Sequence, residues 1–146
     1  MLNEALAEQL LAAWVKLTGV IKNSRVTKGL AYNEAIVMLL LYNRFLEDGD
    51  GLVSIKEITW ETKMLKSLVN RTVNTLEAKG LLERLKTSGD KRMVFVRCIK
   101  EKLDVFLAVH NTSLDLARNL IDIIGEEDAQ AFVRISKKIC DSNYQL

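Results

Sequence analysis

None of the 146 residues is a proline, and the sequence has only two cysteines and a single histidine. Because proline is the residue that interrupts helices most strongly, its absence permits long unbroken helices and predicts a mostly helical protein. Cys98 and Cys140 do not form a disulfide framework on their own, so we expect reduced thiols. One histidine and two distant cysteines also supply too few ligands for zinc, and no metal site is expected.

The chain also lacks the features of exported or membrane-spanning proteins. Its first residues hold no basic cluster followed by an apolar run, as a secretory signal requires. The longest apolar stretch, from Ile36 to Tyr42, is far shorter than the ~20 residues that span a bilayer. We therefore expect a cytoplasmic protein with no membrane partner. The apolar fraction of 49% is that of an ordinary globular protein and excludes a largely disordered chain.

Charge is distributed unevenly along the chain. Residues 54–100 hold 11 Lys/Arg and 5 Asp/Glu, a surplus of 6 positive charges, whereas the flanking segments hold 10 and 14, a deficit of 4. Such asymmetry is typical of a surface that binds a polyanion and is mounted on a neutral or acidic frame. The alternative is a solvated surface on which the charges are scattered at random.

The basic segment shows a recognisable order of elements. Ser54, followed by Glu57 three residues later, is the pattern of a capping box at the start of a short helix. A longer helix is predicted over residues 66–79, and two strand-like runs follow over 81–86 and 93–98. Short helix, turn, longer helix and hairpin is the order of a winged helix-turn-helix. The predicted fold class is mainly α with a small β-hairpin wing (α+β).

Helices are predicted on both sides of this lobe, over residues 2–22 and 33–45 and from residue 100 onward. The last region carries a heptad seam of about three heptads, which Phe106, Leu116 and Leu120 widen. Its members are Leu103, Leu107, His110, Leu114, Ala117, Ile121 and Ile124. At 1.5 Å per residue this helix would be about 33 Å long, too long for a small domain to cover.

The apolar stripes at both chain ends are more than one subunit of this size can hide. A homodimer is therefore expected, with dimerisation helices at 1–30 and 100–146. These segments and a DNA-binding lobe at 31–99 would form one intertwined structural unit.

The helix over residues 67–79 separates into two faces. Leu65, Val69, Val73 and Leu76 are expected to face the core. The opposite face holds no carboxylate, and Glu77 near its edge is the only acid of the helix. Arginine pairs with guanine in the major groove, asparagine with adenine, and serine or threonine with bases or phosphates. The expected DNA-contacting residues of this helix are Lys66, Ser67, Asn70, Arg71, Asn74 and Thr75. The alternative is an ordinary polar surface helix.

The hairpin supplies a second expected contact with DNA. Lys86, Lys91 and Arg92 surround its tip, and Asp90 is the one acid there. We expect Asp90 to pair with Arg92 and fix the direction of its guanidinium. An arginine held on a projecting hairpin suits a narrow minor groove, where the negative potential is strongest.

Several stretches resemble the regulators of the MarR family. The run from Lys66 to Arg84, KSLVNRTVNTLEAKGLLER, is similar to their recognition helix and first wing strand. Residues 88–92, SGDKR, resemble their wing tip with its Asp-x-Arg element, and residues 30–34, LAYNE, are similar to the Leu-Thr-x-x-Gln opening of their second helix. Residues 98–102, CIKEK, depart from the Leu-Thr-x-x-Gly that usually opens the long helix.

The resemblance implies a dimeric transcriptional regulator, expected to be a repressor. Its two recognition helices would enter successive major grooves of a pseudo-palindromic double-stranded operator. Position by position, Ser67, Asn70, Arg71 and Asn74 become candidates for major-groove contact, and Arg92 for the minor groove. Many members release DNA when a small phenolic or aromatic anion binds between the dimerisation helices and the winged-helix lobe.

The sequence offers less support for other functions. Cys98 and His110 could in principle form a nucleophile and base, but no third residue in the sequence is placed to orient them. No glycine-rich phosphate loop follows a strand either, so neither an enzyme nor a cofactor is expected. Peroxide sensing through a cysteine in the first helix has no candidate here. His110 either sets dimer register or contacts a ligand, and Trp14 either lines an aromatic pocket or fills the core. The remaining alternative is a winged-helix module that binds another protein without reading DNA.

Overall fold

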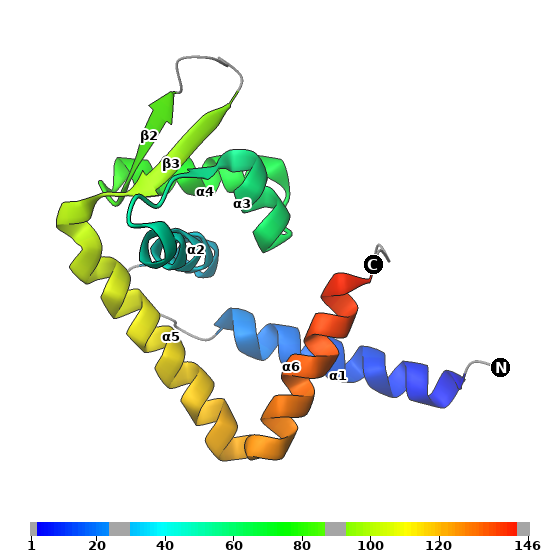
Figure 1. The fold of residues 1–146 in the computed structure, drawn as a ribbon. Coiled ribbons are helices and arrows are strands. Elements are labelled where there is room, and N and C mark those ends of the chain that lie inside the picture. The colour runs from blue at the N-terminus through cyan, green and yellow to red at the C-terminus, as the bar shows by residue number, and fades with distance from the viewer. Residues whose placement is uncertain (1–2, 24–29, 87–92, 143–146) are drawn as a thin grey trace. The chain divides into compact units, whose positions relative to one another are not determined.

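The computed structural model describes residues 3–23, 30–86 and 93–142, which contain six α-helices and three short β-strands (Figure 1). The helices are α1 (Glu4–Asn23), α2 (Tyr32–Asp48), α3 (Ile55–Thr62), α4 (Lys66–Ala78), α5 (Leu103–Ile124) and α6 (Glu126–Asp141). The strands are β1 (Val53–Ser54), β2 (Leu82–Lys86) and β3 (Val94–Cys98), and a 3-10 turn (Lys100–Lys102) precedes α5. The predicted fold class is confirmed. Among the described helices, none combines the length and hydrophobicity that crossing a bilayer demands.

The chain divides into two compact units, Met1–Val109 and His110–Leu146, and the boundary falls within α5. The first unit contains the winged-helix lobe, and the second consists of most of α5 together with α6. Gly125, with φ at +87°, lies between these two helices, and its N–H donates to the carbonyl of Ile121 at 2.7 Å. The sequence predicts this stop, and glycine suits the position because a residue with a Cβ would be strained at this positive φ.

The sheet is antiparallel, in the order β1-β3-β2. In its register Val96 of the central strand lies opposite both Val53 and Arg84. The two wing strands fulfil the prediction from alternating residues, whereas β1 has no counterpart in it. A two-residue strand is too short to show a period and exists because its backbone pairs with β3.

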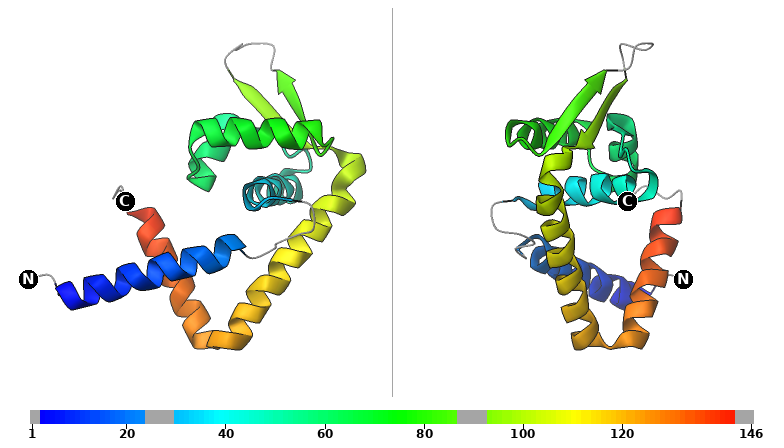
Figure 2. Two further views of the ribbon diagram at one scale, coloured as in Figure 1. Left: turned by 180° about the vertical axis from the view of Figure 1, so that it is seen from behind. Right: turned by 60° about the vertical axis from the view of Figure 1, so that its left-hand side comes forward.

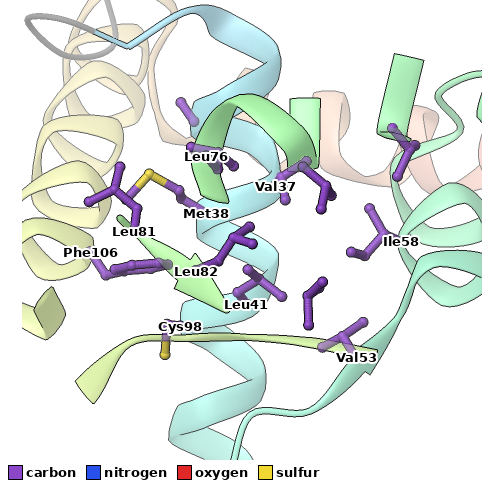
Figure 3. Close-up of a cluster of buried hydrophobic side chains, with 14 of the residues drawn as sticks. Val37, Met38, Leu41, Val53, Ile58, Leu76, Leu81, Leu82, Cys98 and Phe106 are labelled. Carbon is purple, nitrogen blue, oxygen red and sulfur yellow. The ribbon is translucent and has the colours of Figure 1, made fainter. Parts of the chain in front are cut away.

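The core of the lobe forms around α2, whose Val37, Met38 and Leu41 are fully buried (Figure 3). Val69, Val73 and Leu76 of α4 are likewise inaccessible, as the sequence predicts. The expectation that Leu65 also faces the core is wrong, since its side chain is 75% exposed. Leu65 is the N-cap residue of α4 and has extended backbone angles, so the helical face to which its position would assign it does not apply.

Both ends of the helix-turn-helix carry specific terminating interactions. The hydroxyl of Ser54 accepts from the backbone N–H of Glu57 at 3.0 Å, which confirms the predicted cap of α3. At the end of α4, Leu81 N–H donates to the Leu76 carbonyl at 3.0 Å and Gly80 N–H to the Glu77 carbonyl at 2.9 Å. With φ of +72° at Gly80, these bonds form a Schellman motif. The chain therefore leaves α4 directly into β2.

A partly buried ion pair links the end of α4 to the start of α2. The Nζ of Lys79 lies 2.7 and 3.0 Å from the two carboxylate oxygens of Glu34, whose side chain is 8% exposed. The same carboxylate accepts the N–H of Ala31 at 3.1 Å. Because a buried carboxylate is costly without partners, these bonds hold the last turn of α4 against α2.

Replacing Lys79 with methionine should destabilise the lobe by about 1–3 kcal/mol, because the buried carboxylate of Glu34 loses its cationic partner while the apolar stem is kept. Urea unfolding followed by circular dichroism measures the change. The matched control is Lys56→Met at an exposed position of α3, expected to change stability by less than about 0.5 kcal/mol. Equal effects of the two substitutions would contradict the role of the pair.

Candidate nucleic-acid interface

The residues predicted to contact DNA gather on one face of α4. Lys66, Ser67, Arg71, Asn74 and Thr75 are exposed, and Asn70 is half-buried. The opposite face is anchored in the core, so burial of that face fixes which side chains the helix presents to solvent. The hydroxyl of Thr75 donates to the Arg71 carbonyl at 3.0 Å and is therefore left as an acceptor toward any partner.

Arg84 of β2 joins this face, although the sequence analysis did not select it. Its Nη2 donates to the side-chain carbonyl of Asn74, and its Nε donates to the carboxylate of Glu77 at 3.2 Å. The available signal was strand alternation, which places Arg84 on the same side of β2 as the buried Leu82. The link between strand and helix requires the three-dimensional fold and has no local pattern.

These bonds change the chemistry of two residues on α4. The ion pair with Arg84 neutralises Glu77, the one acid of the helix, at the edge of the predicted reading face. Because the carbonyl of Asn74 is occupied, its amide presents N–H donors to a partner. Such donors suit acceptors on base edges, including guanine O6 and N7 and thymine O4. The bidentate pairing with adenine that the sequence suggested requires a free carbonyl.

The wing strands β2 and β3 cross the direction of α4 and project beyond it (Figures 1 and 2). Lys86, the last residue of β2, lies opposite Val94 in the register. The side chain of Lys86 and the whole of Asp90, Lys91 and Arg92 lie outside the described residues. Nearer the base of the wing, Arg97 donates to Glu83 at 2.6 Å and to Asp50 at 2.9 Å, which ties both wing strands to the loop before β1.

The two cysteines have different environments. Cys98 faces the lobe core, and its burial raises the pKa of the thiol above the ordinary value. A raised pKa leaves less of the reactive thiolate at neutral pH. Cys140 of α6 is exposed. Within residues 3–23, 30–86 and 93–142, the His, Cys, Asp and Glu side chains do not form a group of three that could hold a metal ion.

Some residues of the predicted seam on α5 are exposed, and others pack against the core of the lobe. Leu107, Leu114 and Ile121 are 44%, 37% and 43% exposed, and His110 is half-buried. Leu103 packs against the lobe core. Phe106 is 1% exposed within that core, so the expectation that it widens the seam is wrong. Its aromatic ring fills space between the lobe's own elements (Figure 3).

Trp14, the other candidate for a ligand pocket, is 53% exposed on α1. The alternative in which it fills the core of the described structure is therefore wrong. The described residues of α1 include no buried side chain, which leaves its whole apolar stripe accessible within one subunit.

Residues 44–93, from the end of α2 to the start of β3, match the family model described as the MarR family. This segment contains β1, α3, α4 and the first wing strand, β2, and it ends just before β3. This part of the winged-helix lobe is similar to the MarR family. Solved structures that share this fold are described as transcriptional regulators.

Solved MarR-type structures share the fold over nearly the whole chain. The regulator Sco3205 from Streptomyces coelicolor, solved in complex with DNA, is 16% identical at a TM-score of 0.80, covering 99% of this chain and 95% of that one. BldR from Sulfolobus solfataricus is 23% identical at 0.73, covering 95% and 97%. BpsR from Bordetella bronchiseptica, whose DNA binding is regulated by 6-hydroxynicotinic acid, is 15% identical at 0.74, covering 93% and 99%. A search of curated proteins found no match.

Proposed function

We propose that this MarR-type chain is a dimeric, sequence-specific regulator of transcription that binds double-stranded DNA and acts as a repressor. The observation that carries the proposal is the exposed face of α4, where Ser67, Asn70, Arg71 and Asn74 stand together and the only acid is paired with Arg84. A helix of a winged helix-turn-helix with such a face suits the major groove. The DNA complex of Sco3205, which has the same fold, supports it.

Each side chain of the face has a role that follows from its chemistry. Arg71 would donate two guanidinium N–H groups to guanine O6 and N7. Asn74 would donate its side-chain amide hydrogens to an acceptor on an adjacent base. Ser67 and Asn70 lie nearer the N-terminus of α4, where recognition helices meet base edges. Lys66 contacts phosphate. In the wing, Lys86, Lys91 and Arg92 would contact the backbone and minor groove, with Asp90 orienting Arg92.

Exposed apolar surface supports the dimer. Outside the lobe, each of the helices α1, α5 and α6 carries at least four large apolar side chains that are more than a third exposed. They are Leu6, Leu10, Leu11, Trp14, Val15, Leu17 and Val20 of α1, Leu107, Leu114, Leu116, Leu120, Ile121, Ile123 and Ile124 of α5, and Phe132, Val133, Ile135 and Ile139 of α6. Water-exposed apolar area on this scale marks a protein interface. We assign the segments 1–30 and 100–146 to dimerisation and 31–99 to DNA binding.

A small aromatic effector belongs to the same proposal. BpsR, which shares the fold, responds to the hydroxylated aromatic acid 6-hydroxynicotinic acid. Trp14 and His110 are the residues of this chain that we propose for an aromatic or phenolic anion, through ring stacking and hydrogen bonding. Binding of such an anion would release the operator.

The test is selection of genomic DNA fragments by the purified protein at two salt concentrations. The proposal expects an inverted repeat whose recovery weakens steeply with salt, because several Lys and Arg side chains displace counterions from phosphates. Recovery of no motif, with weak binding that salt abolishes, would favour the alternative of a winged-helix module for protein partners.

Arg71→Ala should weaken binding to the selected operator by about 1–3 kcal/mol and relax the preference at one base pair of each half-site. Titration of labelled duplexes carrying each base at each position measures both effects. Lys102→Ala, an exposed lysine on the 3-10 turn after the sheet, is the matched control and should keep the base preference. An Arg71 variant with an unchanged preference would contradict the assignment.

Arg84→Gln should weaken operator binding by about 1–2 kcal/mol, because the Glu77 carboxylate is left unpaired beside DNA phosphates and the Asn74 amide loses its orientation. Adding Glu77→Gln to this variant should recover part of the lost affinity. The affinities of the two variants come from the same titration, with circular dichroism confirming the fold. A double variant as weak as Arg84→Gln alone would show that the Glu77 charge is not the cause.

Leu107→Glu and Leu114→Glu should each shift the protein from dimer to monomer, since both place a charge in the proposed seam. Sedimentation velocity measures the assembly state. Ala108→Glu, on the polar stripe with Asp104 and Asp115, is the control and should remain dimeric. Seam variants that stay dimeric at micromolar concentration would contradict the assignment of α5 to the interface.

A further inference from the structure

Two large apolar side chains stand out at the α3–α4 turn. Leu65 is 75% exposed and Trp60 is 70% exposed, the highest values among large apolar residues in the described part of the lobe. Leu65 is the N-cap of α4, and Trp60 belongs to the last turns of α3. Both therefore flank the turn that, in the proposed function, brings α4 into the major groove.

Leu65 is an unusual residue for its position in two respects, as a helix N-cap and as an exposed apolar side chain. N-caps are normally Ser, Thr, Asp or Asn, whose side-chain oxygen accepts from the first turn of the helix. Leu65 makes no such bond, whereas Ser54 at the start of α3 does. Its apolar side chain is also left in water. Local departures of this kind, without a gain inside the subunit, are expected at functional sites.

The surroundings of this leucine are charged. Lys66 follows it directly, and the Nζ of Lys63 lies 3.9 Å from the ring centroid of Trp60. Glu61 is the one acid between Trp60 and Lys66 in the sequence. An apolar protein partner would remove water from the lysine ammonium groups without supplying an opposite charge. A DNA duplex supplies phosphates that can pair with the lysines beside the few apolar groups of its bases. The charge complements DNA.

We propose that the side chain of Leu65 reads thymine by packing against its C5-methyl group in the major groove. The thymine methyl is the apolar group that the base edges present there, and it distinguishes thymine from the other bases. The residues at the N-terminus of a recognition helix are those that reach base edges. Trp60 in the last turns of α3 and Lys63 at the C-cap of that helix would then lie beside the sugar–phosphate backbone. This inference rests on the proposed function and adds a reader that carries no hydrogen-bonding group.

The experiment replaces single thymines of the selected operator with deoxyuridine, which removes the methyl group and keeps the hydrogen-bonding edge. One thymine per half-site should matter: its replacement should weaken wild-type binding roughly fourfold, the effect of one buried methyl-sized group. In the Leu65→Ala variant the same replacement should have no effect. Leu46→Ala, which truncates another exposed leucine of the lobe, is the control and should respond to deoxyuridine as the wild type does.

A second variant separates recognition from folding. Leu65→Ser supplies the missing cap of α4, so it should raise the melting temperature while lowering operator affinity. If Leu65 served only the fold, the Leu65→Ser protein would lose both thermal stability and operator affinity.

The outcomes distinguish this inference from the proposed function. Specific binding in which no thymine-to-deoxyuridine effect depends on Leu65 overturns the inference and leaves the regulator intact. Absence of specific duplex binding by the wild-type protein overturns the proposed function, and the inference with it.

Discussion

The packing of one stripe of α4 against the core of the lobe is the constraint on which the remaining structure depends. With Val69, Val73 and Leu76 fully buried, the helix cannot rotate about its axis without exposing them to water. The opposite face is then fixed, and it is the face that holds Arg71 and Asn74. The surface that we propose to read DNA is thus determined by side chains that are buried in the lobe core.

Two further interactions fix the position of α4 along its axis. The Schellman motif at Gly80 ends the helix within one residue, and the Lys79–Glu34 pair holds that end against α2. Because β2 begins two residues after Gly80, Arg84 is placed where it can reach back to Asn74 and Glu77. The wing and α4 are therefore joined by the short connection between α4 and β2 and by the hydrogen bonds from the Arg84 guanidinium to Asn74 and Glu77.

The sequence predicted those parts of the structure that follow from local period and local stop signals. The bounds of α5 follow from its apolar repeat and from Gly125, and the exposed face of α4 follows from its helical period. Interactions between distant segments have no local sequence pattern. Strand β1 forms because it pairs with β3, and Arg84 is placed by its hydrogen bonds to residues of α4. Leu65 was misplaced for a related reason, because a helical period was extended to a residue that has extended backbone angles.

The exposed apolar residues of this chain fall into two groups with different physical meaning. On α1, α5 and α6 they form stripes repeated over several turns, and the partner that we propose for this surface is a second copy of the chain. At the α3–α4 turn the exposed apolar residues are only Trp60 and Leu65, and they lie beside Lys63 and Lys66. The apolar surface of two side chains is too small for a stable protein–protein interface. In the DNA complex that we propose, a small apolar contact bordered by positive charge would add base specificity, and the phosphate contacts would position the protein on the duplex. Exposure alone does not separate these groups; the continuity of the apolar surface and the sign of the neighbouring charge do.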